Sequence, residues 1–337
     1  MPGMNIFDDD AFSIVSLTAA INKEKYRPGQ IGATGIFAED GVTTTTVYIE
    51  QRDGKLGLVE PTERGGPGET IADEDRDLVP FRVPHFQRDD AMLADEVQNV
   101  RAFGSEGADG EVIEDRVTRK LARHGQDLQM TLEHQRVGAV KGIVTTKGGR
   151  VLENLYTRFG IATPSAVSLE LDVEATDVGE IVDGVRYSIE DSLDANYDGL
   201  HAFAGRDLHT QLWRHKSVKE TLLSHAGAVE LRMAVPDVFE FGGITWERYR
   251  TGAAATTDLG SAYIAANEAR VVPLGVPDLF ITRFAPADYE DTVNTIGLPL
   301  YARQFPMPNG KGRNLEAQMN AISLCTRPEV LRRLTLT

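Results

Sequence analysis

An acidic run in the second half of the chain has the spacing that comes nearest to a known chemical site. Asp194, Asn196, Asp198 and Gly199 match the first half of a calcium-binding loop, in which carboxylate and amide oxygens surround the ion. The position that should supply a bidentate glutamate is Gly205, and the flanking segments do not read as a pair of helices. The favoured interpretation is therefore an Asx-rich turn in front of a strand.

The histidine and cysteine residues do not indicate a metal or catalytic site more strongly than this acidic run does. A zinc site needs three or four convergent ligands, and the six-residue spacing of His209 and His215 would not place them well on one face of a helix. Cys325 lies in the apolar run 322–325, which predicts a buried structural thiol. The histidines are His85, His124, His134, His201, His209, His215 and His225. We expect no metal and no cofactor.

Enzyme motifs are missing from the sequence. It contains no phosphate-loop pattern and no HExxH, GxSxG, SxxK or CxxC. The glycine-rich stretch 65–68 lacks a following helix and a lysine, which favours a flexible loop over a phosphate site. Carboxylate runs such as 8–10, 73–77 and 89–90 are typical of a solvated surface in an acidic protein.

Composition narrows the class of protein. The chain has 337 residues, enough for two domains, and its 51 acidic and 35 basic residues give a net charge of −16. That charge argues against a surface that grips nucleic acid or an anionic membrane. The one cysteine excludes an intramolecular disulfide, no apolar window approaches about 18 residues, and the acidic start MPGMNIFDDD does not read as a signal peptide. We expect a soluble protein of a reducing compartment.

The first elements that must position any functional residue are a short helix and a β-ribbon. Ile14, Leu17 and Ile21 recur at helical spacing, so a helix is expected to dock there on another surface. Residues 41–61 read as a hairpin with Asp53-Gly54 at its turn, and strand character returns at 78–86. We interpret about 40–86 as a long two-stranded excursion, which is marginal alone and implies a partner surface.

A long helix follows at 111–140. It places Val117, Leu121, His124, Leu128, Leu132 and Gln135 on one stripe. At 1.5 Å per residue this helix would be roughly 40 Å long, which suits a structural spine.

Helices and strands alternate in the second half. The sequence predicts a strand at 200–204, a helix from Asp207, a hairpin at 238–252 that turns at Gly242-Gly243, and buried strands at 269–276 and 279–286. Near the C-terminus, Thr326 and Glu329 fit a capping box that opens a last helical turn with Pro328 early in it.

These segments together resemble the phage capsid E family, the major capsid proteins of tailed phages of the lambda type. The resemblance spans most of the chain, and the number, order and spacing of the matching pieces carry it. The pieces are INKEKYRPGQIGATGIF (21–37), TTTTVYIEQRDGKLGLVEPTERGGPG (43–68), DLVPFRVPHF (77–86), the long helix ending near KGIV (141–144), GGRVLENL (148–155), HAFAGRDLHTQLWRHKSVKETL (201–222), FEFGGITWERYRTG (239–252) and CTRPEVLRRL (325–334). The stretches 69–77 and 253–268 do not look typical of the family.

The resemblance implies a non-enzymatic α+β shell subunit with the Hong Kong 97-like fold. Its parts would be an N-terminal arm at 1–38, an extended β-hairpin loop at 39–87, a peripheral domain at 88–175 with a spine helix at about 110–140, an axial domain at 176–300, and a return to the peripheral domain at 301–337.

The resemblance also implies assembly as the mechanism. Copies would form the hexamers and pentamers of an icosahedral shell in the host bacterial cytoplasm, with a scaffolding protein, a portal and a decoration protein as partners. The shell would enclose DNA without binding it specifically and would expand on maturation. The contact candidates lie in the extended loop: Asp53, Gly54, Lys55, Arg64, Gly65 and Gly66. Some capsids of this fold crosslink a loop lysine to an asparagine, and Lys55 lies near the corresponding place, but no acceptor asparagine or catalytic glutamate is identified.

Two other readings stay open from the sequence. One is a decoration or tail structural protein, although the spine helix and long ribbon argue against it because such parts are usually smaller β-domains. The other is an α/β enzyme on residues 176–300, against which the missing nucleophile, metal and phosphate motifs count.

Overall fold

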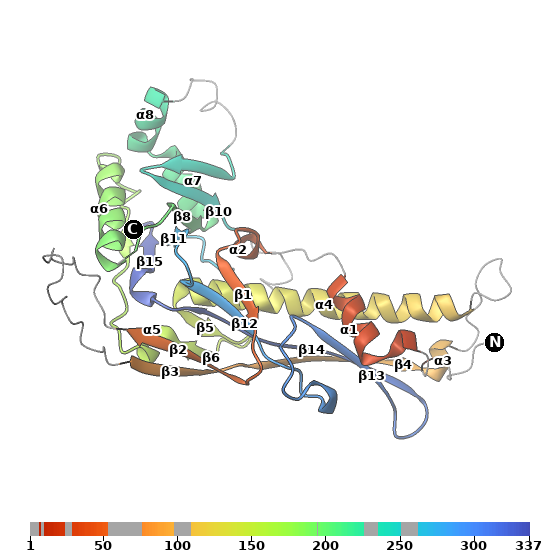
Figure 1. Cartoon of the computed structure of the whole chain (residues 1–337). Coiled ribbons are helices and arrows are strands. Elements are labelled where there is room, and N and C mark those ends of the chain that lie inside the picture. The colour runs from red at the N-terminus through yellow and green to blue at the C-terminus, as the bar shows by residue number, and fades with distance from the viewer. Residues whose placement is uncertain are drawn as a thin grey trace, which may run out of the picture. The chain divides into compact units, whose positions relative to one another are not determined.

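The computed structural model describes most of the chain (Figure 1). The residues it describes are 7, 10–23, 29–52, 76–97, 109–193, 195–225, 235–250 and 262–337. They form two compact units, which are described separately here. Unit 1 comprises 1–47, 82–136 and 281–324, and unit 2 comprises 48–81, 137–280 and 325–337.

Unit 1 is built from short helices, one long helix and a sheet. Its helical elements are the 3-10 turns Asp10–Phe12 and Glu290–Thr292 (η4), with α1 (Ile14–Lys23), α2 (Gln30–Ala33), α3 (Ala94–Val97) and most of α4 (Asp109–Lys141). Its strands are β1 (Phe37–Gly41), β4 (His85–Leu93), β12 (Phe280–Phe284), β13 (Tyr301–Pro306) and β14 (Gly312–Cys325).

The sheet of unit 1 is organised around β14. The strand order is β1-β12-β14-β13, and β4 also pairs with β14 in antiparallel register from Gly312 opposite Leu93 to Asn320 opposite His85. β13 and β14 form an antiparallel hairpin. In Figure 1, α1 crosses α4 at a steep angle, and a Cβ placed on Gly125 of α4 would be 3.4 Å from Ile21 of α1. The predicted docked helix is thereby confirmed.

The long helix α4 confirms the predicted spine. It spans Asp109–Lys141, about 50 Å at 1.5 Å per residue. Its predicted stripe is buried at every one of its positions, which are Val117, Leu121, His124, Leu128, Leu132 and Gln135. The core of unit 1 forms where the apolar members of this stripe meet α1 and the sheet.

Unit 2 combines a six-stranded sheet with helices. Its helices are α5 (Leu155–Arg158), α6 (Val178–Ser192), α7 (Arg206–Arg214) and α8 (Lys216–His225), with the 3-10 turn Pro328–Val330. The sheet strands are β7 (Val167–Ser168), β8 (Gly199–Ala204), β9 (Val238–Phe241), β10 (Ile244–Arg248), β11 (Glu268–Leu274) and β15 (Arg332–Thr335). The remaining pairs are β2 (Thr46–Arg52) with β3 (Arg76–Arg82), and β5 (Ile143–Thr145) with β6 (Val151–Asn154).

The six-stranded sheet has the order β7-β15-β11-β8-β10-β9. Alternate residues of β8, namely Leu200, Ala202 and Ala204, lie in one hydrophobic core with α6 and α7. In α6 the core residues fall at helical spacing, and Asp177 caps the helix by accepting hydrogen bonds from the amides of Gly179 and Glu180. One face of the sheet is therefore covered by helices. The mixture of separate helices and mostly antiparallel strands confirms the α+β class.

The structure bears on two local predictions, the hairpin at 41–61 and the capping box at Thr326. Only part of the hairpin predicted at 41–61 lies within the described residues. Its first strand forms β2, which pairs with β3, and its Asp53-Gly54 turn lies outside them. The predicted capping box at Thr326 is wrong. Pro328–Val330 is a 3-10 turn with no side-chain cap, and the Thr326 hydroxyl instead donates to the carbonyl oxygen of Asp278 at 2.9 Å. The hydroxyl is thus used as a donor to a distant carbonyl oxygen, where the capping box required it to accept from a local backbone amide.

Candidate inter-subunit surfaces

The pair β2–β3 has one buried and one exposed face. In β2, Val47 and Ile49 are buried while Tyr48 between them is 62% exposed. In β3, Phe81 is fully buried while Leu78 is 58% exposed. Alternation follows from the period of two along a strand, so each face is set by every second residue. We name Tyr48 and Leu78 the ribbon outer face.

The buried face of β3 is held by α5. The rings of Phe81 and Phe159 lie 5.6 Å apart, and the guanidinium of Arg158 lies 5.6 Å from the centre of the Phe81 ring. Arg158 also donates a hydrogen bond to the carbonyl oxygen of Pro80 at 2.8 Å. These contacts support the base of the ribbon from one side and leave its outer face open for a partner.

The contact residues expected from the sequence are not among those that the structure describes. Its description of the ribbon stops at Arg52 and resumes at Arg76. The residues concerned are Asp53, Gly54, Lys55, Arg64, Gly65 and Gly66.

A buried carboxylate fastens the N-terminal segment to α4. The side chain of Glu133 is almost fully buried and accepts hydrogen bonds from the backbone amides of Ile31 at 2.9 Å and Gly32 at 3.1 Å. A Cβ on Gly29 would lie 2.0 Å from Glu133 Cδ, so only glycine leaves room for this approach. We name Gly29, Ile31, Gly32 and Glu133 the arm anchor.

One turn further along α4, a buried arginine holds β1. Arg136 is almost fully buried, forms an ion pair with Glu39, and lies with its guanidinium 5.5 Å from the centre of the Phe37 ring. Both the charge and the flat guanidinium face are thus used, which a lysine would not reproduce. Together with the arm anchor, this pair ties residues 29–41 to the spine helix.

A second buried carboxylate lies in unit 2 and meets cations. Glu268 of β11 is within 3.4 Å of Lys141 Nζ, 3.2 Å of Arg270 and 3.1 Å of Arg333. It also accepts a hydrogen bond from the backbone amide of Ala265. We name Glu268, Lys141, Arg270 and Arg333 the charge cluster; it joins the end of α4, a central strand and the C-terminal strand.

The charges of this cluster shift one another's pKa values. Burial alone would raise the pKa of the Glu268 carboxyl, but Arg270, Lys141, the Ala265 amide and Arg333 together lower it below its ordinary value. Burial lowers the pKa of Lys141, and the charge of Glu268 opposes that change. The cluster therefore stabilises the fold while Glu268 is ionised.

Within the described ranges, the residues weighed as chemical groups are not gathered into a site. Among the described residues, no group of three His, Cys, Asp or Glu side chains could hold a metal ion. Cys325 is fully buried and burial raises its thiol pKa, which confirms the predicted structural thiol. Within the same part of the chain, no helix combines the length and apolar character needed to cross a membrane.

Sequence reasoning missed Tyr48, Leu78, Gly29 and Glu133. The alternation of the β2 and β3 segments was a signal for the ribbon outer face, but which face is exposed depends on α5. No local signal links Gly29 to Glu133, because their contact joins segments far apart in the chain.

Comparisons with known proteins point to one family over most of the chain. The family model described as "Phage major capsid protein E" matches residues 13–336. The major capsid protein of Pseudomonas phage KPP10 is 29% identical over 88% of this chain and 89% of its own. The major capsid protein of Salmonella phage Felix O1 is 22% identical, with 95% of each chain covered.

Solved structures show the same fold at low sequence identity. A prophage protein of Escherichia coli CFT073 assigned as a capsid protein has a TM-score of 0.58 at 12% identity, covering 96% of this chain and 99% of its own. The capsid of phage XM1, of the Myoviridae, has a TM-score of 0.50 at 11% identity, covering 92% and 93%. These likenesses confirm the Hong Kong 97-like fold, and with the family match they establish that the chain belongs to the phage major capsid protein E family.

Proposed function

We propose that copies of this chain assemble into the hexamers and pentamers of an icosahedral phage head that encloses double-stranded DNA. The family makes the chain a structural subunit of the virion capsid rather than an enzyme. The ribbon outer face carries the proposal, because a two-stranded ribbon that exposes Tyr48 and Leu78 gains stability by packing on another surface. We propose that this surface belongs to a neighbouring copy.

Each part of the chain receives a role in this proposal. Residues 1–38 act as the N-terminal arm, 39–87 as the extended loop, 88–175 as the peripheral domain, 176–300 as the axial domain and 301–337 as the return segment. The two structural units overlap these ranges without sharing all their bounds. The arm anchor supports the first assignment, because it fastens the base of the arm to the spine helix.

The proposal extends to the ribbon tip and to other proteins of the head. Asp53, Gly54, Lys55, Arg64, Gly65 and Gly66 lie between the two ribbon strands in sequence, so they are proposed to contact the same neighbouring copy. A scaffolding protein would guide assembly, a portal would occupy one vertex, and a decoration protein would bind the outside. DNA packaging would drive expansion to the mature shell.

The acidic composition supports a role of enclosing DNA without gripping it. A net charge of −16 disfavours adhesion to the packaged genome, since phosphate binding depends on clustered cations. Free subunits should show no salt-dependent affinity for double-stranded DNA in a filter-binding assay. Tight binding that weakens as salt rises would contradict this part of the proposal.

Expression followed by negative-stain electron microscopy tests the main proposal. We expect shells, tubes or capsomer rings, alone or with a scaffolding protein co-expressed. A subunit that stays a monodisperse monomer with scaffold, crowding agent and salt would overturn it.

A double variant and a deletion test the role of the ribbon in the same experiment. Tyr48→Ser with Leu78→Ser should lower the yield of particles while the subunit keeps its melting temperature, because both side chains are exposed. Val151→Ser is a matched control, because Val151 is a similarly exposed strand residue of β6, outside the ribbon. Deleting 62–77 should likewise leave a folded subunit that assembles poorly. Loss of folding in that deletion would mean that the segment belongs to the core.

A further inference from the structure

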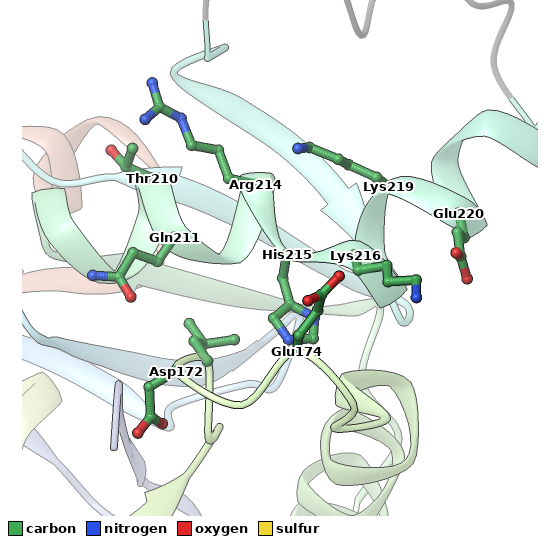
Figure 2. Close-up of a pocket in the computed structure, with 10 residues that line it drawn as sticks. Asp172, Glu174, Thr210, Gln211, Arg214, His215, Lys216, Lys219 and Glu220 are labelled. Atoms are coloured by element: carbon green, nitrogen blue, oxygen red, sulfur yellow. The ribbon is translucent and has the colours of Figure 1, made fainter.

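A hollow of about 590 Å³ opens in unit 2 where α7 meets α8. Figure 2 shows that its walls come from these two helices and from the segment 171–174 in front of α6. His215, at the junction of α7 and α8, lies in the wall and is almost fully buried. Its Nε2 is 3.1 Å from the carbonyl oxygen of Val173, while its Nδ1 has no hydrogen-bond partner among the described residues.

Charged side chains of both signs line the hollow. In Figure 2, Arg214 and Lys219 lie on one side of the opening, and Asp172 and Glu174 lie on the other. Lys216 and Glu220 also line it. Both Arg214 and Lys219 are exposed, and none of the ion pairs found in the described part of the chain includes either of them. In a protein of net charge −16, two neighbouring unpaired cations attract an acidic surface.

The outer stripe of α6 is such a surface. Glu180, Gly184, Tyr187 and Asp191 follow one another at spacings of four, three and four residues, so they share one side of the helix. Tyr187 is 53% exposed between the two acids, and Gly184 has no neighbouring atom that would crowd a partner. Exposed tyrosine flanked by charged groups is the composition typical of a binding hot spot with a polar rim.

Arg186 keeps Tyr187 in place. Its guanidinium lies 5.1 Å from the centre of the Tyr187 ring and is also 3.4 Å from Asp183 and 3.8 Å from Glu190. A side chain that is already held loses less conformational freedom when it binds. The stripe is therefore a partly pre-organised aromatic anchor with carboxylates at both ends.

We propose that the α6 stripe of one copy docks into the α7–α8 hollow of another copy. Tyr187 enters the hollow, and Glu180 and Asp191 face Arg214 and Lys219. The hollow is larger than one aromatic side chain needs, and burying a tyrosine removes about 150–250 Å² from water. The occupant is a second copy because the complementary chemistry lies on this same chain. This contact rests on the self-assembly proposed above and names one of its interfaces.

Charge reversal and its rescue test the contact. Arg214→Glu with Lys219→Glu should reduce the yield of sedimenting particles roughly tenfold or more, because like charges then face each other. Glu180→Lys with Asp191→Lys should reduce it similarly. The combination of all four changes should restore the yield, since each reversed surface again meets an opposite charge. Arg150→Glu, at an exposed turn of the same unit, is the control and should leave the yield unchanged.

The outcomes separate this contact from the proposed function. Wild-type protein that stays monomeric with scaffold, crowding agent and salt overturns the assembly proposal and this contact with it. Wild-type assembly together with normal assembly of either double variant, or with failure of the four-fold variant to recover, overturns the contact alone. Tyr187→Ala provides a second test of the contact if a charge variant fails to fold. It should keep the wild-type melting temperature and lose particles, whereas Val151→Ala should lose none; normal assembly by Tyr187→Ala also overturns the contact.

Discussion

The arm anchor and the charge cluster each stabilise a buried glutamate, but with different partners. Each buries one glutamate, Glu133 or Glu268, and each joins segments far apart in the chain. The two hydrogen bonds described for Glu133 come from neutral backbone amides, whereas Glu268 meets three cationic side chains as well as one amide. Backbone donors are fixed by the chain and carry no net charge. Cations must themselves be kept out of water, so their stability depends on the carboxylate that pairs with them.

The largest expected effect is at the charge cluster. Glu268→Gln leaves Arg270 and Lys141 partly buried without a counter-charge, and we expect a loss of roughly 3 kcal/mol in the free energy of unfolding. Arg333 is half-exposed and is rehydrated, which keeps the loss at the lower end for a buried pair. Urea unfolding followed by circular dichroism measures it. A loss no larger than that of Glu133→Gln would remove the distinction between the two regions.

Protonation of Glu268 by acid should also weaken the charge cluster and lower the free energy of unfolding. The pKa of Glu268 in the folded protein is lower than its unfolded value of about 4.3, so its contribution is complete above that pH. The contribution is lost as the pH falls through the folded-state pKa. The difference in stability between wild type and Glu268→Gln should therefore shrink below about pH 4. Unfolding curves at a series of pH values test this, and a constant difference would contradict it.

The next effect concerns the space in the arm anchor. Gly29→Ala would place a Cβ against the Glu133 carboxylate, and we expect a loss of about 2 kcal/mol as one of them is displaced. Gly35→Ala is not a suitable control because Gly35 has a positive φ. Gly184→Ala is suitable, because no atom lies near that position and it is helical, so stability should be kept or raised. Thermal melting compares the two, and equal melting temperatures would show that the close approach costs nothing.

The smallest effect should come from removing the charge of the arm anchor. Glu133→Gln keeps an oxygen that accepts a backbone amide, so we expect a loss of about 1 kcal/mol. Hydrogen exchange of the Ile31 and Gly32 amides gives a local measurement, and both should exchange faster in the variant. Exchange as slow as in wild type would mean that the carboxylate does not hold these amides.

Elements with a regular local pattern were predictable from the sequence, whereas contacts between distant residues were not. The α4 stripe and the hairpin of β9 and β10 follow from local spacing and from the Gly242-Gly243 turn, whose two residues have positive φ. The Thr326 capping box failed because a distant carbonyl oxygen took the hydroxyl. Neither buried carboxylate could be foreseen, because Glu133 and Glu268 are ordinary acidic residues in an acidic sequence.

The sequence by itself determined the class of protein, its family and the placing of most helices and strands. Those properties depend on composition, on period and on the order of segments, which are all local or additive along the chain. Only the tertiary structure decided which ribbon face is exposed, which glutamates are buried, and that Tyr187 and the α7–α8 hollow are both open on the same unit. Burial and pairing depend on residues far apart in sequence, and their distances are set when the chain packs.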